Sequence, residues 1–206
     1  MIPSSGVYLI TDEHALSFHQ LRSLITQLTQ RQLISLVQYR AKTLPYQQQL
    51  AQTKLLVNIC HQNKALLLVN DHLELAQAAN ADGVHLGQKD TSVTTARKIL
   101  GTSAIIGLTC HNNVEKAQQA AADSADYVAF GRFFPSKTKP SAPAAAIDTL
   151  KQAKHTLSIP IVAIGGITPD NGKRLLTAGA DLLAVIDGIL GAADPILAAH
   201  AYHALF

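Results

Sequence analysis

Short apolar runs alternate along this chain with longer segments in which apolar and polar residues recur at helical spacing. The apolar runs predict strands at Val7–Thr11, Ile34–Arg40, Ala65–Asn70, Gly83–Leu86, Ala104–Thr109, Tyr127–Gly131, Pro160–Ile164 and Leu182–Ile186. The segments between them predict helices at Leu21–Gln32, Tyr46–Asn63, Leu73–Asn80, Val93–Leu100, Val114–Asp123, Ala146–Leu157, Asp170–Ala178 and Pro195–Leu205.

This alternation indicates the fold class. Strands separated by helices favour βαβ units and a parallel sheet that is buried on both faces. Eight such units in 206 residues fit a single α/β (β/α)8 TIM barrel, with residues 1–206 forming one catalytic domain. An open, doubly wound sheet is the alternative. It is disfavoured because no G-x-G-x-x-G follows the first strand, where Thr11-Asp12-Glu13-His14 stands instead.

Composition narrows the classes of function. Hydrophobic residues make up 48% of the chain and charged residues 15%, which predicts a packed core. A net charge of +3 and only 5% aromatic residues argue against a nucleic-acid partner. Cys60 and Cys110 fit neither a disulfide scaffold nor a zinc site. With no apolar span or secretory signal, we expect a cytoplasmic protein without a membrane partner; the oligomeric state, homo-oligomers included, stays open.

Candidate chemistry gathers just beyond the predicted strands, where the active sites of such barrels lie. Gln38, Arg40 and Lys42 share one face at the end of the second strand, while Tyr39 and Ala41 face the other way. An amide, a guanidinium and an ammonium group together favour an anion and the edge of a heterocycle. The alternative is a merely solvated strand end.

Two carboxylates follow the next two strands. Asn70-Asp71 ends the third strand and Asp90 lies beyond the fourth. Mg²⁺ favours one or two carboxylates together with water and substrate phosphates. Each aspartate could instead cap a helix, beginning at Leu73 or near Val93. The pair beside two cations favours a metal–diphosphate site.

Later strand ends suggest contacts for a second anion. Ser136, Thr138 and Lys139 lie on a long loop after the sixth strand, which is typical of a lid or of a mobile surface loop. Gly165-Gly166 and Ile186-Asp187-Gly188 follow the seventh and eighth strands, the usual phosphate position in these barrels. Of the nine histidines, none forms a metal motif, and His85 and His111 are expected near this rim.

Together these segments resemble the thiamine phosphate synthase family over nearly the whole chain, from Tyr8 to Pro195. The matching motifs are Gln38-x-Arg40-x-Lys42, Asn70-Asp71, Ala81-Asp82-Gly83-Val84-His85-Leu86-Gly87-Gln88-x-Asp90, Gly107-x-Thr109-x-His111, Phe134-Pro135-Ser136-x-Thr138-Lys139 and Ala163-Ile164-Gly165-Gly166-Ile167. Each motif is short, but their order and spacing make the resemblance specific.

The resemblance implies a transferase of thiamine biosynthesis. It would join 4-amino-2-methyl-5-hydroxymethylpyrimidine diphosphate to thiazole phosphate by a dissociative, Mg²⁺-assisted mechanism, in which diphosphate leaves before the thiazole nitrogen attacks. Asp71 and Asp90 would hold Mg²⁺, and Arg40, Lys42 and Lys139 would be catalytic. The implied pyrimidine diphosphate contacts are Gln38, Tyr39, Arg40, Ala41, Lys42, Asn70, Thr109 and Lys139. The implied thiazole phosphate contacts are Ser136, Lys137, Thr138, Gly166, Ile186 and Asp187.

This chain departs from the family pattern at four positions. Ala41 replaces a common acidic residue, Thr109 the usual Ser, and Arg132 a common Pro. Asp187 stands where Ser is typical, beside the implied phosphate. A carboxylate there would repel a phosphate, so we expect Asp187 to turn away and cap the short helix that follows.

Two other functions are compatible with the same fold. One is a thiazole tautomerase, an isomerase that needs neither metal nor diphosphate. The other is a regulator that binds a phosphate ligand without catalysis. The chain keeps Lys42, Asn70, Asp71 and Asp90, which favours the synthase over both.

Overall fold

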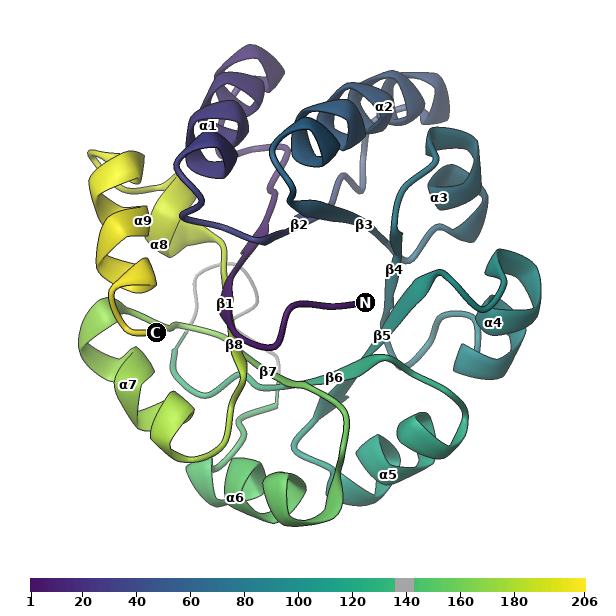
Figure 1. Cartoon of the computed structure of the whole chain (residues 1–206), viewed down its shortest axis with the longest axis vertical. Helices are drawn as coiled ribbons and strands as arrows, with labels where there is room; N and C mark the ends of the chain where they lie inside the picture. The colour runs from purple at the N-terminus through teal and green to yellow at the C-terminus, as the bar shows by residue number, and fades with distance from the viewer. Residues whose placement is uncertain (136–142) are drawn as a thin grey trace.

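The computed structural model describes residues 1–135 and 143–206. Its strands form a closed barrel in the order β1 to β8, in which every neighbouring pair is parallel and β8 returns to pair with β1. Figure 1 shows the helices as an outer ring around these strands. The predicted TIM barrel is therefore confirmed.

The elements lie close to the positions that the apolar pattern predicts. The strands are β1 (Gly6–Ile10), β2 (Leu36–Tyr39), β3 (Leu66–Asn70), β4 (Gly83–Leu86), β5 (Ile105–His111), β6 (Tyr127–Phe130), β7 (Ile161–Ile164) and β8 (Leu182–Val185). The helices are α1 (Phe18–Gln30), α2 (Tyr46–Gln62), α3 (Leu73–Ala79), α4 (Val93–Leu100), α5 (Val114–Ala122), α6 (Ile147–Thr156), α7 (Pro169–Thr177), α8 (Asp187–Leu190) and α9 (Pro195–His203).

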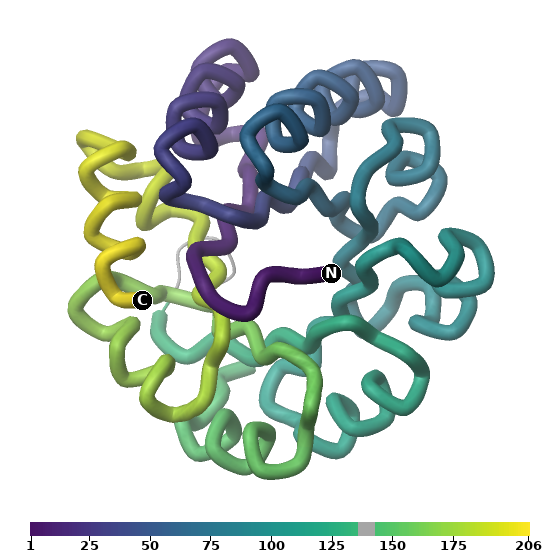
Figure 2. The backbone as a smooth tube through the Cα atoms, in the orientation of Figure 1, coloured from purple at the N-terminus to yellow at the C-terminus, as the bar shows by residue number. Residues whose placement is uncertain are grey.

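The core has an inner and an outer layer, because successive strand residues point to opposite faces. In β1, Tyr8 and Ile10 belong to the cluster that fills the barrel, while Val7 and Leu9 pack outward against the helices. Both sets are buried, which explains why the strands are continuously apolar. Figure 2 shows α9 beside α1, and contacts between these two helices close the outer ring. None of the helices in the described part of the chain has the length and apolar character needed to span a membrane.

Three equivalent aspartates, each directly before an even-numbered strand, join the N-terminal ends of the strands. Each carboxylate accepts a hydrogen bond from a backbone N–H of the preceding strand, and each also contacts a basic side chain of the helix layer. The sets are Asp82 with Leu67 N at 2.7 Å and His61, Asp126 with Ile106 N at 2.7 Å and Arg97, and Asp181 with Ile161 N at 2.8 Å and Lys154. These contacts stabilise the N-terminal end of the barrel, opposite the rim at the C-terminal strand ends.

Candidate active site

A cavity of about 590 Å³ lies at the C-terminal ends of the strands. Ten of the residues singled out in the sequence line it: Gln38, Arg40, Lys42, Asn70, Asp71, Asp90, Thr109, Gly166, Ile186 and Asp187. His85, His111 and Arg132 line it as well. The barrel therefore brings together side chains that the sequence places on separate strand ends.

The period of two predicted at the end of β2 holds in the structure. Gln38, Arg40 and Lys42 face the cavity. The Tyr39 hydroxyl points the other way and donates to Gln52 Oε1 of α2 at 2.8 Å. Ala41 is buried in the outer layer. The side chains of Tyr39 and Ala41 thus pack against the helices, and any ligand contact from these two positions falls to the backbone.

Asp71 and Asp90 meet at one side of the cavity. Burial, together with hydrogen-bonding contact and charge repulsion from the Asp90 carboxyl, raises the pKa of Asp71 above its ordinary value. Asn70 Nδ2 donates to Asp71 Oδ2 at 2.5 Å, and Lys42 Nζ lies 3.8 Å from the same oxygen. Asp90 Oδ2 in turn accepts from the Gly87 N–H at 2.7 Å. Two facing carboxylates form a donor set that a cation would stabilise.

Neither aspartate caps a helix, so the capping alternative is wrong for both. Helix α3 begins after His72, and no side chain caps it. Helix α4 is capped by Ser92, whose hydroxyl accepts from the Thr95 N–H. Asp71 has a φ of +63°, and its carboxylate contacts that of Asp90.

The acid pair fits a metal that is shared with a substrate. Among residues 1–135 and 143–206, no three His, Cys, Asp or Glu side chains converge as a complete protein metal site. Mg²⁺ is commonly held by one or two carboxylates, with water and phosphate oxygens completing its coordination. The chemistry of this donor set therefore fits Mg²⁺ with a bound diphosphate.

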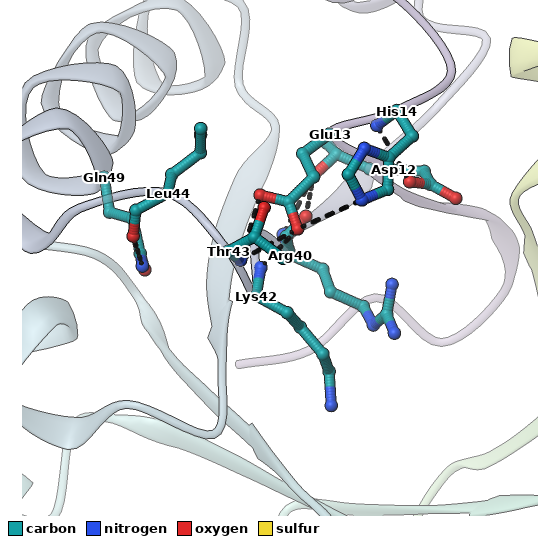
Figure 3. A network of polar contacts seen from close by, with 9 residues as sticks. Asp12, Glu13, His14, Arg40, Lys42, Thr43, Leu44 and Gln49 are labelled. Atoms are coloured by element: carbon teal, nitrogen blue, oxygen red, sulfur yellow. Dashed lines mark hydrogen bonds and ion pairs between the residues drawn. The ribbon is translucent and has the colours of Figure 1, made fainter.

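Glu13 organises the cationic loop, and the sequence reading missed it. Its carboxylate accepts from the backbone N–H groups of Lys42 at 2.7 Å and Thr43 at 3.0 Å. Figure 3 shows the side chains of Arg40 and Lys42 extending away from this contact. Burial opposes ionisation, but the N–H donors prevail and lower the pKa of Glu13. Its place just beyond β1 was the available signal, since that position lies on the same rim.

We expect Glu13→Gln to destabilise the protein in a pH-dependent manner. A carboxylate whose pKa is lowered in the folded protein stabilises the fold at pH values above its ordinary pKa of 4.5. This stabilisation is lost as the pH falls through the lowered pKa. At pH 7 the free energy of unfolding should fall by about 1.5 kcal/mol, the lower end for hydrogen bonds to a charged group. Urea unfolding from pH 7 downward measures this difference, which should shrink toward acid pH. A difference that does not vary with pH would contradict the role of the charge.

Glycine is required at the far side of the cavity. Gly165 and Gly166 have φ values of +102° and +62°, a region that L side chains rarely adopt. A Cβ on Gly166 would lie 2.2 Å from the carbonyl oxygen of Pro135. The backbone after β7 therefore stays open to the cavity, as close approach of an anion requires.

The structure corrects the expectation for Asp187, which does not cap α8. Asp187 is the first residue of that helix, and its N-cap is Ile186, without a side-chain hydrogen bond. The helix is a single turn, and the Asp187 carboxylate extends along it: a Cβ on Gly191 would lie 2.5 Å from Asp187 Oδ1. Burial and then the charge of Asp187 raise the pKa of Tyr202 to about 12. Asp187 thus contributes to the cavity wall while its Oδ1 lies toward the far end of α8.

The cysteines carry no visible nucleophilic chemistry. Both are buried free thiols, and burial raises the pKa of Cys60 and of Cys110 to about 12. Neither lines the cavity, so neither is placed to act as a nucleophile there. Ser136, Lys137, Thr138 and Lys139 lie outside the described residues.

Comparison with known proteins decides the family. The family model described as "Thiamine monophosphate synthase" matches residues 7–189. The chain belongs to this family. It is 45% identical to a thiamine-phosphate synthase of Nitrosococcus oceani over 201 residues, covering 98% of this chain and 92% of the relative. It is 46% identical to that of an Azoarcus species over 201 residues, covering 98% of this chain and 97% of the relative.

Solved structures agree with this membership. The thiamine phosphate pyrophosphorylase of Pyrococcus furiosus superposes with a TM-score of 0.87 at 29% identity, covering 98% of this chain and 95% of that one. A 3-hexulose-6-phosphate synthase has a TM-score of 0.70 at 17% identity, covering 96% and 99%. The second likeness shows the barrel fold alone. The family resemblance inferred from short motifs in the sequence is confirmed.

Proposed function

We propose that this protein condenses 4-amino-2-methyl-5-hydroxymethylpyrimidine diphosphate with thiazole phosphate, and releases thiamine phosphate and pyrophosphate. The observation that carries the proposal is the rim on which Arg40 and Lys42 lie beside the facing carboxylates of Asp71 and Asp90. Cations beside a metal-type carboxylate pair match a diphosphate leaving group. Membership of the family supports the same reaction.

The diphosphate belongs at the cationic side of the cavity. Asp71 and Asp90 would hold Mg²⁺, which when bound neutralises charge on the departing diphosphate. The guanidinium of Arg40 suits bidentate contact with phosphate oxygens, and the ammonium of Lys42 adds a compact charge. Lys42 Nζ lies 3.8 Å from Asp71 Oδ2, so it can contact the same phosphate oxygens as the metal.

The reaction needs no general base. The bond between the pyrimidine methylene carbon and the diphosphate oxygen breaks first, and its electron pair leaves with the oxygen. The thiazole nitrogen then uses its lone pair to form the new C–N bond, and no proton leaves the nucleophile. The residues of this chain act by orienting both partners and by stabilising charge as it develops.

The remaining predicted residues divide between the two substrates. Gln38, Asn70 and Thr109 line the cavity, and we assign them to the pyrimidine on the family resemblance. Gly166, Ile186 and Asp187 line the cavity as well, and we assign their backbone N–H groups to the thiazole phosphate. We assign Ser136, Lys137 and Thr138 to the same phosphate on the family resemblance.

Product identification tests the proposal against its alternatives. The purified protein is incubated with Mg²⁺ and both substrates, with each substrate alone as control, and the mixtures are separated by chromatography. We expect thiamine phosphate only when both substrates are present. A tautomerase would rearrange a thiazole substrate alone, and a regulator would bind phosphate ligands without turnover; either result would replace the proposed function.

Lys139 is expected to act on the departing diphosphate. Replacement by Ala should lower kcat by about a hundredfold while KM for either substrate changes less, because the contact strengthens only as charge develops. Steady-state kinetics with each substrate varied in turn measure the two effects. A change confined to KM would limit Lys139 to binding.

A further inference from the structure

A buried chain of hydrogen bonds crosses the barrel beneath the cavity. Gln38 Nε2 donates to the Tyr8 hydroxyl at 2.6 Å, and the Tyr8 and Tyr127 hydroxyl oxygens lie 2.9 Å apart. The Tyr127 hydroxyl lies 2.7 Å from His85 Nδ1, and His85 Nε2 lies 2.8 Å from Thr109 Oγ1. Five side chains from five different strands are thus joined end to end.

The two tyrosines lie below the reach of any ligand. Tyr8 is 1% exposed and Tyr127 fully buried, and neither lines the cavity, whereas Gln38 and Thr109 do. The Tyr127 ring also stacks on His85, with ring centroids 5.5 Å apart. Burial raises the pKa of both tyrosine hydroxyls, so each keeps its single proton to donate.

The Gln38 end favours one direction for the whole chain. The Gln38 amide nitrogen can only donate, so the Tyr8 oxygen accepts; with every buried hydroxyl also donating its proton, Tyr8 donates to the Tyr127 oxygen. In the same arrangement Tyr127 donates to His85 Nδ1, and this places the ring proton of a neutral His85 on Nε2. The Nε2–H group would then donate to Thr109 Oγ1. The Thr109 hydroxyl is therefore available to donate a hydrogen bond to a ligand in the cavity, and Gln38 Oε1 is available to accept one.

We propose that Tyr8 and Tyr127 are positioning residues, and that the polarity they impose selects a heterocycle edge with an amino donor beside an unprotonated ring nitrogen. The proposal rests on the proposed function, in which the substrate is an aminopyrimidine. That edge donates to Gln38 Oε1 and accepts from the Thr109 hydroxyl. A 4-oxo pyrimidine presents the reverse pattern, a carbonyl beside a ring N–H, and is rejected because buried polar groups would be left unpaired.

Removing one link should release this selectivity. In Tyr127→Phe, His85 Nδ1 loses its hydrogen-bond donor, so the ring proton can lie on either nitrogen. With the proton on Nδ1, Nε2 would accept a hydrogen bond from the Thr109 hydroxyl, which could then no longer donate to a ligand. We expect KM for the aminopyrimidine diphosphate to rise about threefold to tenfold, the range for one lost neutral hydrogen bond. KM for thiazole phosphate should stay within about twofold, because no member of the chain lies on that side of the proposed site. The preference for the amino over the 4-oxo diphosphate should fall by a similar factor.

Thr29→Val is the matched control. The Thr29 hydroxyl is also buried and donates to Ile25 O at 2.8 Å, but it lies on α1 away from the cavity. This variant should lower the melting temperature without changing either KM or the amino/oxo preference. Tyr8→Phe breaks the same chain at another link and should reproduce Tyr127→Phe, which keeps the test valid if one tyrosine variant folds poorly.

The tautomer of His85 is a second readout, independent of turnover. Long-range ¹H–¹⁵N spectra of the wild-type protein, with the His85 ring signals assigned by their loss in His85→Asn, should show the proton on Nε2. A proton on Nδ1, equal effects of Tyr127→Phe on both KM values, or an unchanged amino/oxo preference would overturn the proposal. Failure to form thiamine phosphate would overturn the proposed function, while the spectra would still report on the polarity.

Discussion

Asp71→Asn and Asp90→Asn should each reduce turnover by at least roughly a hundredfold, with partial rescue at high Mg²⁺ concentration. The two carboxyls face each other beside Lys42. Each substitution therefore removes one of the two side chains expected to bind the metal. Turnover is measured over a Mg²⁺ titration. Asp148→Asn is the control, because Asp148 is an exposed residue of α6 that forms an ion pair with Lys151 one turn away, and it should leave the titration unchanged.

The same variants separate a metal site from a structural pair. Without Mg²⁺, replacing one of two repelling carboxylates should leave the melting temperature unchanged or raise it. In the wild-type protein, Mg²⁺ with pyrophosphate should raise that temperature, and the rise should be lost in both variants. Turnover that survives both substitutions and persists in a chelator would remove the metal from the account.

Arg40→Ala and Lys42→Ala should weaken the pyrimidine diphosphate far more than the thiazole phosphate. The diphosphate would bury the charged groups that contact it, and truncating one partner of a charge pair that binding buries costs about 2–5 kcal/mol. This corresponds to a loss of about thirtyfold to several thousandfold. Both side chains line the cavity beside Asp71 and Asp90, whereas the open backbone at Gly166 lies after β7.

Separate titrations of the two substrates measure this difference. Lys151→Ala removes a cation on the surface of α6 and controls for the change in net charge. Equal losses for both substrates would mean that Arg40 and Lys42 do not distinguish the two phosphate positions.

Local patterns in the sequence were sufficient to predict the barrel. Continuous apolar strands reflect burial on both faces, and their order along the chain is also their order in the sheet. The apolar pattern predicts that α1 starts at Leu21, which is later than the observed start at Phe18, behind a capping box formed by Ser17 and Gln20. That signal is local and was available, because Ser followed by Gln three positions later is typical of a helix start.

The candidate site was predictable where it depends on strand register alone. Alternation after β2 was enough to point Gln38, Arg40 and Lys42 into the cavity, and the parallel barrel brought Asp71 to Asp90. The position of Glu13 just beyond β1 places it on the same rim, but its contact with the backbone of Lys42 joins two distant segments, and such a contact leaves no mark in one sequence.

Buried polar groups are hard to predict from the sequence for a different reason. Tyr8 and Tyr127 lie in the barrel interior, at strand positions that any large apolar residue could fill, so the apolar pattern gives no sign of a role for their hydroxyls. Asp187 was misassigned because a helix of one turn begins a residue earlier than its composition suggests. The backbone angles at Ile186 decide that start, and they are not encoded in a short motif.

Pyrophosphate release is the most direct test of the proposed Mg²⁺-assisted condensation. The purified protein is supplied with both substrates, and pyrophosphate and thiamine phosphate are followed together in Mg²⁺ and in excess chelator. We predict that the two products appear in equal amounts with Mg²⁺ and fall to background in the chelator. Equal rates in both conditions, or pyrophosphate without thiamine phosphate, would contradict it.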